Sequence, residues 1–243
     1  AFPIQGGGTA YGQNRITRRL MTVDEVQRHV LETQRRDADW LRRHILAALF
    51  TNAAWTFTDK LLGSLTIQPL ALASDSVTYL RRGGSVATDT HHLGFASIDA
   101  AMFASIYGEL VEHPGNGDRV VVYVPTASVA TITALTGFVP VQDPDIEPAI
   151  SAARLRTGAA DMLGPGVKVH GKINMCWVVE WPSIPDNYAV ALALDSEDTP
   201  LGMREYDDPA LQGLFTESIS PDGVSLQVNF IRYAGFGALN RVA

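Results

Sequence analysis

Residues 119–125 read Arg-Val-Val-Val-Tyr-Val-Pro, and such a short apolar run is typical of a strand buried inside a sheet. Pro125 ends the strand, because proline has no backbone N–H to give to a ladder. Thr126 follows and is the expected N-cap of a helix that Gly137 closes. Upstream, an apolar stripe at helical spacing predicts a helix over residues 97–113. The stretch therefore predicts a compact domain that mixes helices and strands.

Strands with a period of two residues follow in the second half of the chain. Apolar and polar side chains alternate over residues 167–181, which predicts one long strand. Pro182 breaks it, and residues 188–194 are the expected return strand. A further alternating strand is expected over residues 224–230, near the end of the chain.

The first half predicts longer elements, because only Pro3 and Pro69 precede residue 114. Thr22 with Glu25 three residues later forms a capping-box pattern, and apolar residues at helical spacing continue to about residue 50. We expect a helix roughly 40 Å long here, since each residue adds ~1.5 Å. Such a helix is long for a compact sphere of this chain length and suits an elongated subunit.

Two other segments lack a strong apolar pattern of their own. Four glycines among the first twelve residues predict a flexible N-terminal arm over 1–21. Residues 56–96 scatter apolar positions among Thr, Ser and Gly, and predict one long, twisted hairpin with Arg81 and Arg82 at its tip. A two-stranded ribbon is marginal in water by itself, so this one needs its own domain or a neighbouring subunit to lie on.

The composition is that of a globular protein with a large core. The chain has 243 residues, of which 46% are hydrophobic and 19% charged. These values exclude collagen, a disordered polymer and a disulfide scaffold, the last because Cys176 is the single cysteine. The most apolar stretch, 45–57, is interrupted by Thr51 and Asn52 and is too short to cross a bilayer, so no membrane partner is expected.

Charge is distributed unevenly along the chain. The formal net charge is −7, but residues 1–50 hold eight Arg against five acidic residues, a balance of +3. The remaining 11 basic and 21 acidic residues give −10. Two interpretations of the basic N-terminal segment stay open: a solvated helix face, or a segment that faces a polyanion or an acidic neighbour.

The sequence carries no convincing catalytic or metal motif. Asp89 and His91 could share a face of an extended chain, but no further ligand follows at metal spacing, which favours a polar loop. His170 and Cys176 on one strand would lie roughly 20 Å apart at ~3.3 Å per residue, too far for a catalytic dyad. The glycine clusters lack the strand–turn–helix order of a nucleotide site. We therefore expect no catalytic residue, no metal and no cofactor.

Four segments resemble the major capsid proteins of tailed bacteriophages. These proteins have the Hong Kong 97-type fold, which is also the fold of encapsulin shells. Val120–Pro125 is similar to the family's strand–proline–helix step, and Val169–Leu194 is similar to its region of glycine, strand, proline and strand. Leu201–Leu214 is similar to a segment of some phage members, and Phe230–Arg241 is similar to the closing strand.

The resemblance implies an α+β fold of the Hong Kong 97 type, built from six parts. They are an N-terminal arm (1–21), an N-terminal helical segment (22–55), an extended loop hairpin (56–96), a spine helix with a peripheral-domain strand (97–125), an axial domain (126–215) and a strand that returns to the peripheral domain (216–243).

The function that the resemblance implies is structural and not enzymatic. The chain would be a major capsid protein that assembles as pentamers and hexamers into an icosahedral phage head around double-stranded DNA. Its partners would be further copies of itself, portal, scaffolding or decoration proteins, and the packaged DNA, bound without sequence specificity. The chain would be found in the virion, after assembly in the host cytoplasm.

Charged residues are the expected contacts between subunits, and two other functions stay open as alternatives. Arginines that project from the hairpin would pair with acidic residues of neighbours. The expected interface residues are Arg81, Arg82, Arg204, Glu205 and Arg232. The alternatives are an encapsulin-like compartment shell and a small α/β enzyme that uses Asp89, His91 or Cys176.

Overall fold

The structure is a computed structural model, and it divides into two units. Unit 1 is formed by residues 1–70 with 201–239, and unit 2 mainly by residues 71–200. The described residues are 2–14, 19–59, 63–72, 76–89, 92–141, 167–196, 199–221 and 225–239.

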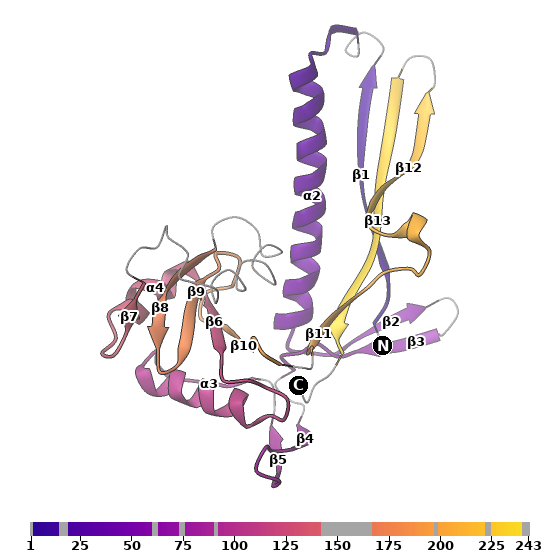
Figure 1. The fold of residues 1–243 in the computed structure, drawn as a ribbon. Coiled ribbons are helices and arrows are strands. Elements are labelled where there is room, and N and C mark those ends of the chain that lie inside the picture. The colour runs from indigo at the N-terminus through magenta and orange to yellow at the C-terminus, as the bar shows by residue number, and fades with distance from the viewer. Residues whose placement is uncertain are drawn as a thin grey trace. The chain divides into compact units, whose positions relative to one another are not determined.

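Unit 1 is a four-stranded antiparallel sheet with one long helix along it (Figure 1). The central strand β13 pairs with β1 on one side over ten residues, from Gln5 opposite Ala234 to Asn14 opposite Ser225. Its other side pairs with β12 and then with β11. The elements are β1 (Gln5–Asn14), α2 (Val23–Phe50), β11 (Leu201–Arg204), a short 3-10 helix (Pro209–Leu211), β12 (Leu214–Pro221) and β13 (Ser225–Ala238).

The capping box predicted for α2 is confirmed. The Thr22 backbone N–H donates to the Glu25 carboxylate at 2.8 Å, and the Glu25 N–H donates back to the Thr22 hydroxyl at 3.3 Å. These reciprocal bonds satisfy two backbone donors that a helix start leaves without a partner. The first hydrogen bond is also the main reason that the pKa of Glu25 is lowered.

The expectation of a flexible N-terminal arm is wrong for residues 5–14, which form strand β1. Alternate residues of β1 are half-buried, and α2 packs on that side of the strand. A Cβ atom at Gly7 would lie only 2.3 Å from the Trp40 ring of α2. The glycine that suggested flexibility therefore allows the helix to approach the strand closely.

Residues 56–96 were expected to form one hairpin, and this is also wrong, since they form two short hairpins in separate sheets. The first belongs to unit 1 and joins β2 (Trp55–Asp59) to β3 (Gly63–Ile67). The second belongs to unit 2 and joins β4 (Val77–Leu80) to β5 (Val86–Asp89). The buried Ile67 and Leu70 end the first hairpin, and the Leu70 N–H donates to the carbonyl of Ala48 at 2.9 Å. The chain is therefore anchored to α2 at Leu70, in the middle of the segment that was expected to form one long hairpin.

Unit 2 contains a five-stranded sheet in the order β10-β6-β9-β8-β7. Only β6 and β9 are parallel, and the other pairs are antiparallel. Every residue of β6 is buried, as the apolar run predicts. The strands are β6 (Val120–Val124), β7 (Val139–Pro140), β8 (Lys168–Ile173), β9 (Cys176–Glu180) and β10 (Val190–Ala193).

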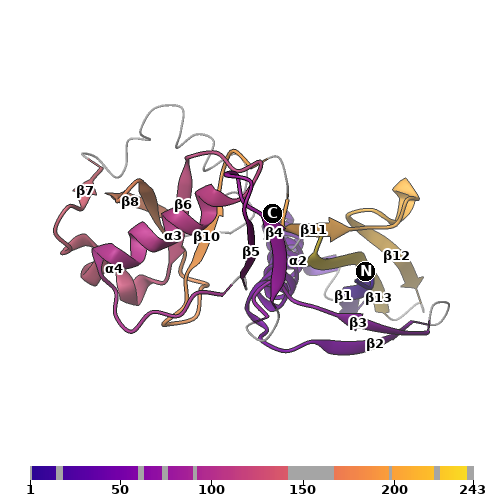
Figure 2. The same ribbon diagram turned by 90° about the horizontal axis from the view of Figure 1, so that it is seen from below.

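Two helices cover one face of this sheet, α3 (Ala100–Glu112) and α4 (Thr126–Thr133), both of which can be followed in Figure 2. The hydrophobic core of unit 2 lies between the helices and the sheet. Its buried members are Met102, Phe103, Ile106, Val120, Val122, Val124, Ile132, Ile173, Cys176 and Val178. The predicted helix over 97–113 is thus confirmed within a few residues, and its N-cap is Asp99, which accepts from the Met102 N–H at 2.8 Å.

The single strand predicted over 167–181 is wrong, because the chain turns back at Asn174 and Met175. Both residues have left-handed backbone, with φ of 41° and 69°. Asn tolerates this conformation and is a common turn residue, whereas Met adopts it infrequently, so Asn174 was the turn signal that the alternating pattern outweighed. The N-cap predicted at Thr126 is also wrong, since Pro125 takes that position and Thr126 is the first helical residue.

Candidate assembly surfaces

Arg81 lies at the end of β4, where it is tied to the end of α3 within unit 2. Its Nε atom lies 3.1 Å from the Glu112 carboxylate, which also accepts a hydrogen bond from the Tyr79 hydroxyl. The Tyr79 ring stacks on His113, with centroids 4.0 Å apart and planes 7° from parallel. A hydrogen bond with Tyr79 and the Glu112 charge raise the pKa of Arg81. The Arg81 side chain is 45% exposed, so part of it stays accessible to a partner.

Arg82 is also held within unit 2. Its backbone N–H donates to the Glu112 carbonyl at 2.8 Å, and its guanidinium donates to the carbonyl of Asn116. Asn116 is buried and donates to the carbonyl of Leu110 at 2.9 Å. The two arginines expected at an intersubunit contact thus have partners in their own unit, and their role between subunits stays a prediction.

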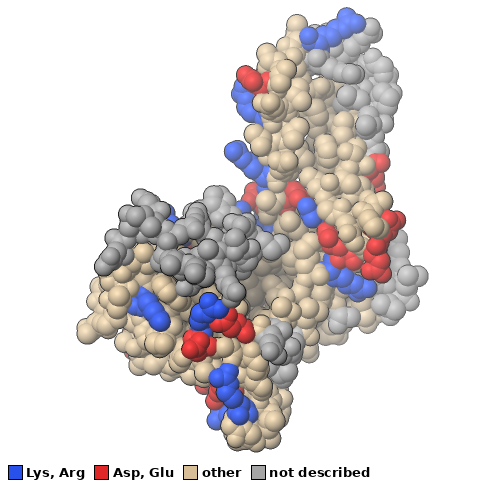
Figure 3. Space-filling view, in the orientation of Figure 1, with Lys and Arg blue, Asp and Glu red and all other residues tan. Residues whose placement is uncertain are grey.

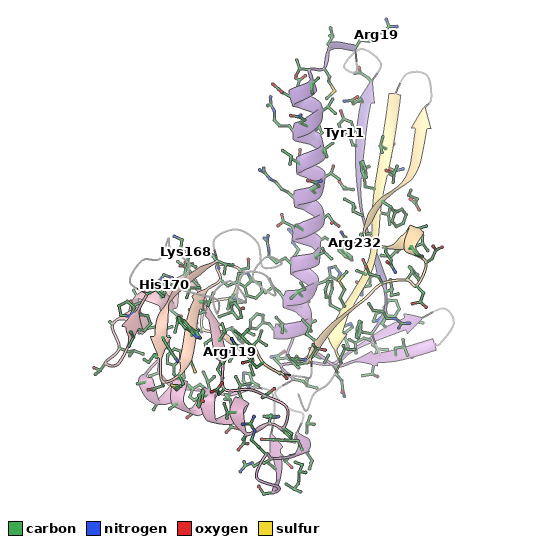
Figure 4. All side chains as sticks on the ribbon, in the orientation of Figure 1. Tyr11, Arg19, Arg119, Lys168, His170 and Arg232 are labelled. Carbon is green, nitrogen blue, oxygen red and sulfur yellow. The ribbon has the colours of Figure 1, made fainter. Side chains whose placement is uncertain are left out.

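Arg232 is the centre of an ion-pair cluster in unit 1, between β13 and α2 (Figure 4). Its Nε and Nη2 atoms donate to the two oxygens of Asp37 at 2.7 and 2.8 Å. Glu205 lies 3.4 Å from the same guanidinium and also accepts from the Gly213 N–H at 3.1 Å. The side chains of Arg232 and Asp37 are only 15% and 12% exposed, which makes this an internal pair of unit 1. Arg204, on β11, is exposed.

Of the three residues in the enzyme alternative, only Cys176 has a described side chain. His91 lies outside the described residues, as does the side chain of Asp89. Cys176 is buried, its thiol donates to the carbonyl of Phe103 at 3.5 Å, and burial raises its pKa to about 11. A buried thiol with a raised pKa is a poor nucleophile. Within the described part of the chain, no group of three or more His, Cys, Asp and Glu could hold a metal ion.

A polar cluster that the sequence did not predict joins β8, β9 and α4. Glu180 lies 2.8 Å from Nε2 of His170 and accepts from the Thr126 hydroxyl at 2.6 Å. Partial burial opposes ionisation of Glu180, but these hydrogen bonds outweigh it and lower its pKa. The ladder is irregular between Val169 and Gly171, at His170. In the ladder Lys168 lies opposite Glu180, and His170, at the irregularity, reaches Glu180 with its side chain. A periodicity of two cannot predict such an irregularity.

Apolar side chains are exposed in the first half of α2 and just before it. Five such residues are exposed to solvent in the described part of the chain, with Val23 at 73%. They are Leu20, Val23, Val26, Val30 and Leu31. From Thr22 to Glu32 every residue is exposed, and Figure 3 shows uncharged surface beside several charged groups on this part of unit 1. We call these five residues the α2 apolar patch. Contiguous exposed apolar surface of this kind is characteristic of interaction sites.

No helix in the described residues has the length and apolar character needed to cross a membrane.

Comparisons with known proteins show a likeness of fold. No protein-family model matches the chain, and no curated protein matches its sequence. A chain in a structure of Mycobacterium phage Patience aligns with 100% of this chain and 69% of its own length, with a TM-score of 0.65 and 16% identity. A chain in a structure titled satellite phage P4 procapsid including size determination protein aligns with 99% of this chain and 73% of its own, with a TM-score of 0.42 and 12% identity.

Proposed function

We propose that this chain is a structural subunit of a bacteriophage head, a major capsid protein of the Hong Kong 97 type. Copies of it would assemble as pentamers and hexamers into an icosahedral shell around double-stranded DNA. Portal, scaffolding or decoration proteins would be further partners, and the chain would have no enzymatic activity. The observation that carries the proposal is the shared fold with a chain of Mycobacterium phage Patience over the full length of this chain.

The packing of unit 1 supports an assembling protein. Six of its described apolar residues are buried, and all of them lie near one end of α2 and β13. They are Phe2, Ala48, Leu49, Ile67, Leu70 and Ala234. The α2 apolar patch lies at the other end of the helix and has no such core. Burial of one Val or Leu side chain contributes about 1.5–3 kcal/mol, so a neighbouring subunit on this patch would stabilise both partners.

The enzyme alternative has less support than the shell. Cys176, its only thiol, is enclosed in the core of unit 2 beside Phe103. A second cluster with acid–base groups among the described residues, His170 with Glu180 and Thr126, is held together by its own hydrogen bonds. The encapsulin-like alternative shares the fold and differs in cargo, so only the content of the particle separates it from a phage head.

The direct test is the state of the purified protein in solution. We expect sedimentation and negative-stain microscopy to show closed shells or capsomers above a threshold concentration. Nucleic acid that resists nuclease inside particles from infected cells would support the phage head, whereas enclosed protein cargo would support a compartment. A chain that remains monomeric under all assembly conditions would overturn both shell functions.

A pair of variants tests the α2 apolar patch. Val23→Glu with Val30→Glu places two charges on exposed positions, so we expect normal folding and loss of assembly. Arg28→Gln with Arg35→Gln changes the charge of the same helix equally without altering the patch, and should assemble. Equal assembly of both variants would show that the patch does not contact a neighbour.

A further inference from the structure

The sheet of unit 1 ends at β1, whose outer edge is not paired with any strand among the described residues. The inner edge of β1 is fully used by its ten-residue ladder with β13. Helix α2 lies over one face of β1, as the contact between Gly7 and Trp40 shows, so it does not supply ladder hydrogen bonds to the edge. Alternate residues of β1 from Gln5 to Gln13 therefore direct their N–H and C=O groups to the outer edge.

This edge lacks the devices that normally prevent a strand from pairing with another chain. Charged residues, prolines and bulges are the usual protection of an edge strand. β1 reads QGGGTAYGQN, without a charge or a proline, and its ladder runs without a register shift. The edge strand β12 in the same sheet has all three: Glu217, a terminal Pro221, and an irregularity between Thr216 and Ser218. The two edges of one sheet thus differ in the way expected if only β1 is used for pairing.

The face of β1 turned away from α2 consists mostly of small residues, and the Tyr233 ring of β13 lies against it at Gly6. Alternate residues on that face are exposed, and four of the five are glycine or alanine. They are Gly6, Gly8, Ala10 and Gly12. Glycine in a strand interior weakens the strand and often marks a place where another backbone approaches closely. Neither Gly8 nor Gly12 has a positive φ angle. A Cβ atom at Gly8 would lie 3.2 Å from the Phe230 carbonyl of β13, whereas one at Gly12 would meet no heavy atom within 4 Å, so Gly12 is the glycine that packing within this chain does not explain.

We propose that a second copy of this chain adds a strand to the free edge of β1, so that the sheet of unit 1 continues across two subunits. The inference rests on the proposed shell function, which surrounds each chain with copies of itself. An uncharged edge also requires an uncharged partner strand, because a charged side chain would lose hydration there without gaining a counter-charge. The chain carries such a strand in β3, Gly63–Ile67, and β2 is its one partner strand among the described residues.

Amide hydrogen exchange of the purified protein, before and after assembly, tests this directly. Peptides that cover residues 5–14 should exchange at least ~10-fold more slowly in the assembled form, because outward-facing amides of β1 become ladder donors. Peptides that cover 214–221 in β12 should exchange at the same rate in both forms. Shells that form without slower exchange in β1 would overturn the inference and leave the proposed function standing. A chain that forms no assembly would overturn both.

A lysine on each edge strand supplies the matched comparison. Ala10→Lys puts a charge on an exposed position of β1, and we expect it to raise the concentration needed for assembly by at least ~10-fold. Thr216→Lys does the same on β12 and should leave that concentration unchanged. Thermal melting of the unassembled subunits should be the same for both variants. Assembly of Ala10→Lys at the wild-type concentration would contradict the proposed pairing.

Discussion

Arg232 on β13 and Asp37 on α2 are 195 residues apart in the chain and form a two-point ion pair, with N–O distances of 2.7 and 2.8 Å. The pair lies between the sheet and the helix of unit 1, where both side chains are largely shielded from water. Paired geometry of this kind fixes the position of a helix on a sheet more specifically than apolar contacts do.

The first prediction concerns the stability that this pair provides. Asp37→Ala leaves the Arg232 charge shielded without its main partner and should destabilise unit 1 by about 3 kcal/mol. Arg232→Met with Asp37→Leu replaces both charges by apolar side chains and should recover most of that loss. Hydrogen exchange of β1 and β13 amides in the unassembled chain measures the effect. Additive losses in the double variant would mean that the two residues do not act as a pair.

The second prediction concerns the close approach of α2 to β1. Gly7→Ala places a Cβ atom 2.3 Å from the Trp40 ring, so helix or ring must move. We expect a loss of about 1–3 kcal/mol in the free energy of unfolding, measured by urea denaturation. Gly12→Ala is the control, because no heavy atom lies within 4 Å of its added Cβ. Equal stability of the two variants would show that Trp40 has room to shift.

The third prediction separates two roles of Arg81. Arg81→Glu places a carboxylate against Glu112 and should speed hydrogen exchange over residues 77–89, because the hairpin loses its tie to α3. Arg81→Glu with Glu112→Arg restores an opposite-charge pair and should slow that exchange again. If the double variant restores the hairpin but not shell assembly, Arg81 also contacts a neighbouring subunit. If it restores both, the arginine acts only within unit 2.

The fourth prediction concerns the reactivity of Cys176. Its pKa of about 11 leaves ~0.1% of the thiol ionised at pH 8, and its side chain is buried. We expect a disulfide reagent to label the folded chain at least ~100-fold more slowly than the chain in denaturant. Rapid labelling of the folded chain at one thiol per molecule would contradict the buried position and revive the enzyme alternative.

The fifth prediction concerns acid stability through Glu180. Its pKa lies below the ordinary 4.5 in the folded chain, so its pairing stabilises the fold above that value. The contribution is lost as the pH falls through the lowered folded-state pKa, because protonation removes the acceptor charge. We expect wild type to melt above Glu180→Gln at neutral pH, with a gap that closes below about pH 4.5. A gap that widens in acid would contradict this sign.

The sequence alone determined those elements whose signals lie within one or two helical turns. Thr22 and Glu25 predicted the start of α2, and the run at 120–124 predicted the buried strand β6. It also predicted the mixed fold class and the return strand that became β10. In each case the decisive interactions join neighbours in the chain, so local spacing carries them.

Only the tertiary structure decided which distant segments pair. By themselves, the glycines at 6–8 indicate flexibility. In the structure they lie in a strand that pairs with β13, more than 200 residues later, and Gly7 lies against Trp40. At Asn174 and Met175 the sequence held one turn residue inside a strictly alternating pattern, and only the packing of β8 and β9 against α3 and α4 in one core shows that the chain turns there. A sheet edge, or an ion pair such as Arg232 with Asp37, depends on which distant segment lies beside it in the folded chain. Sequence periodicity gives no information about that segment.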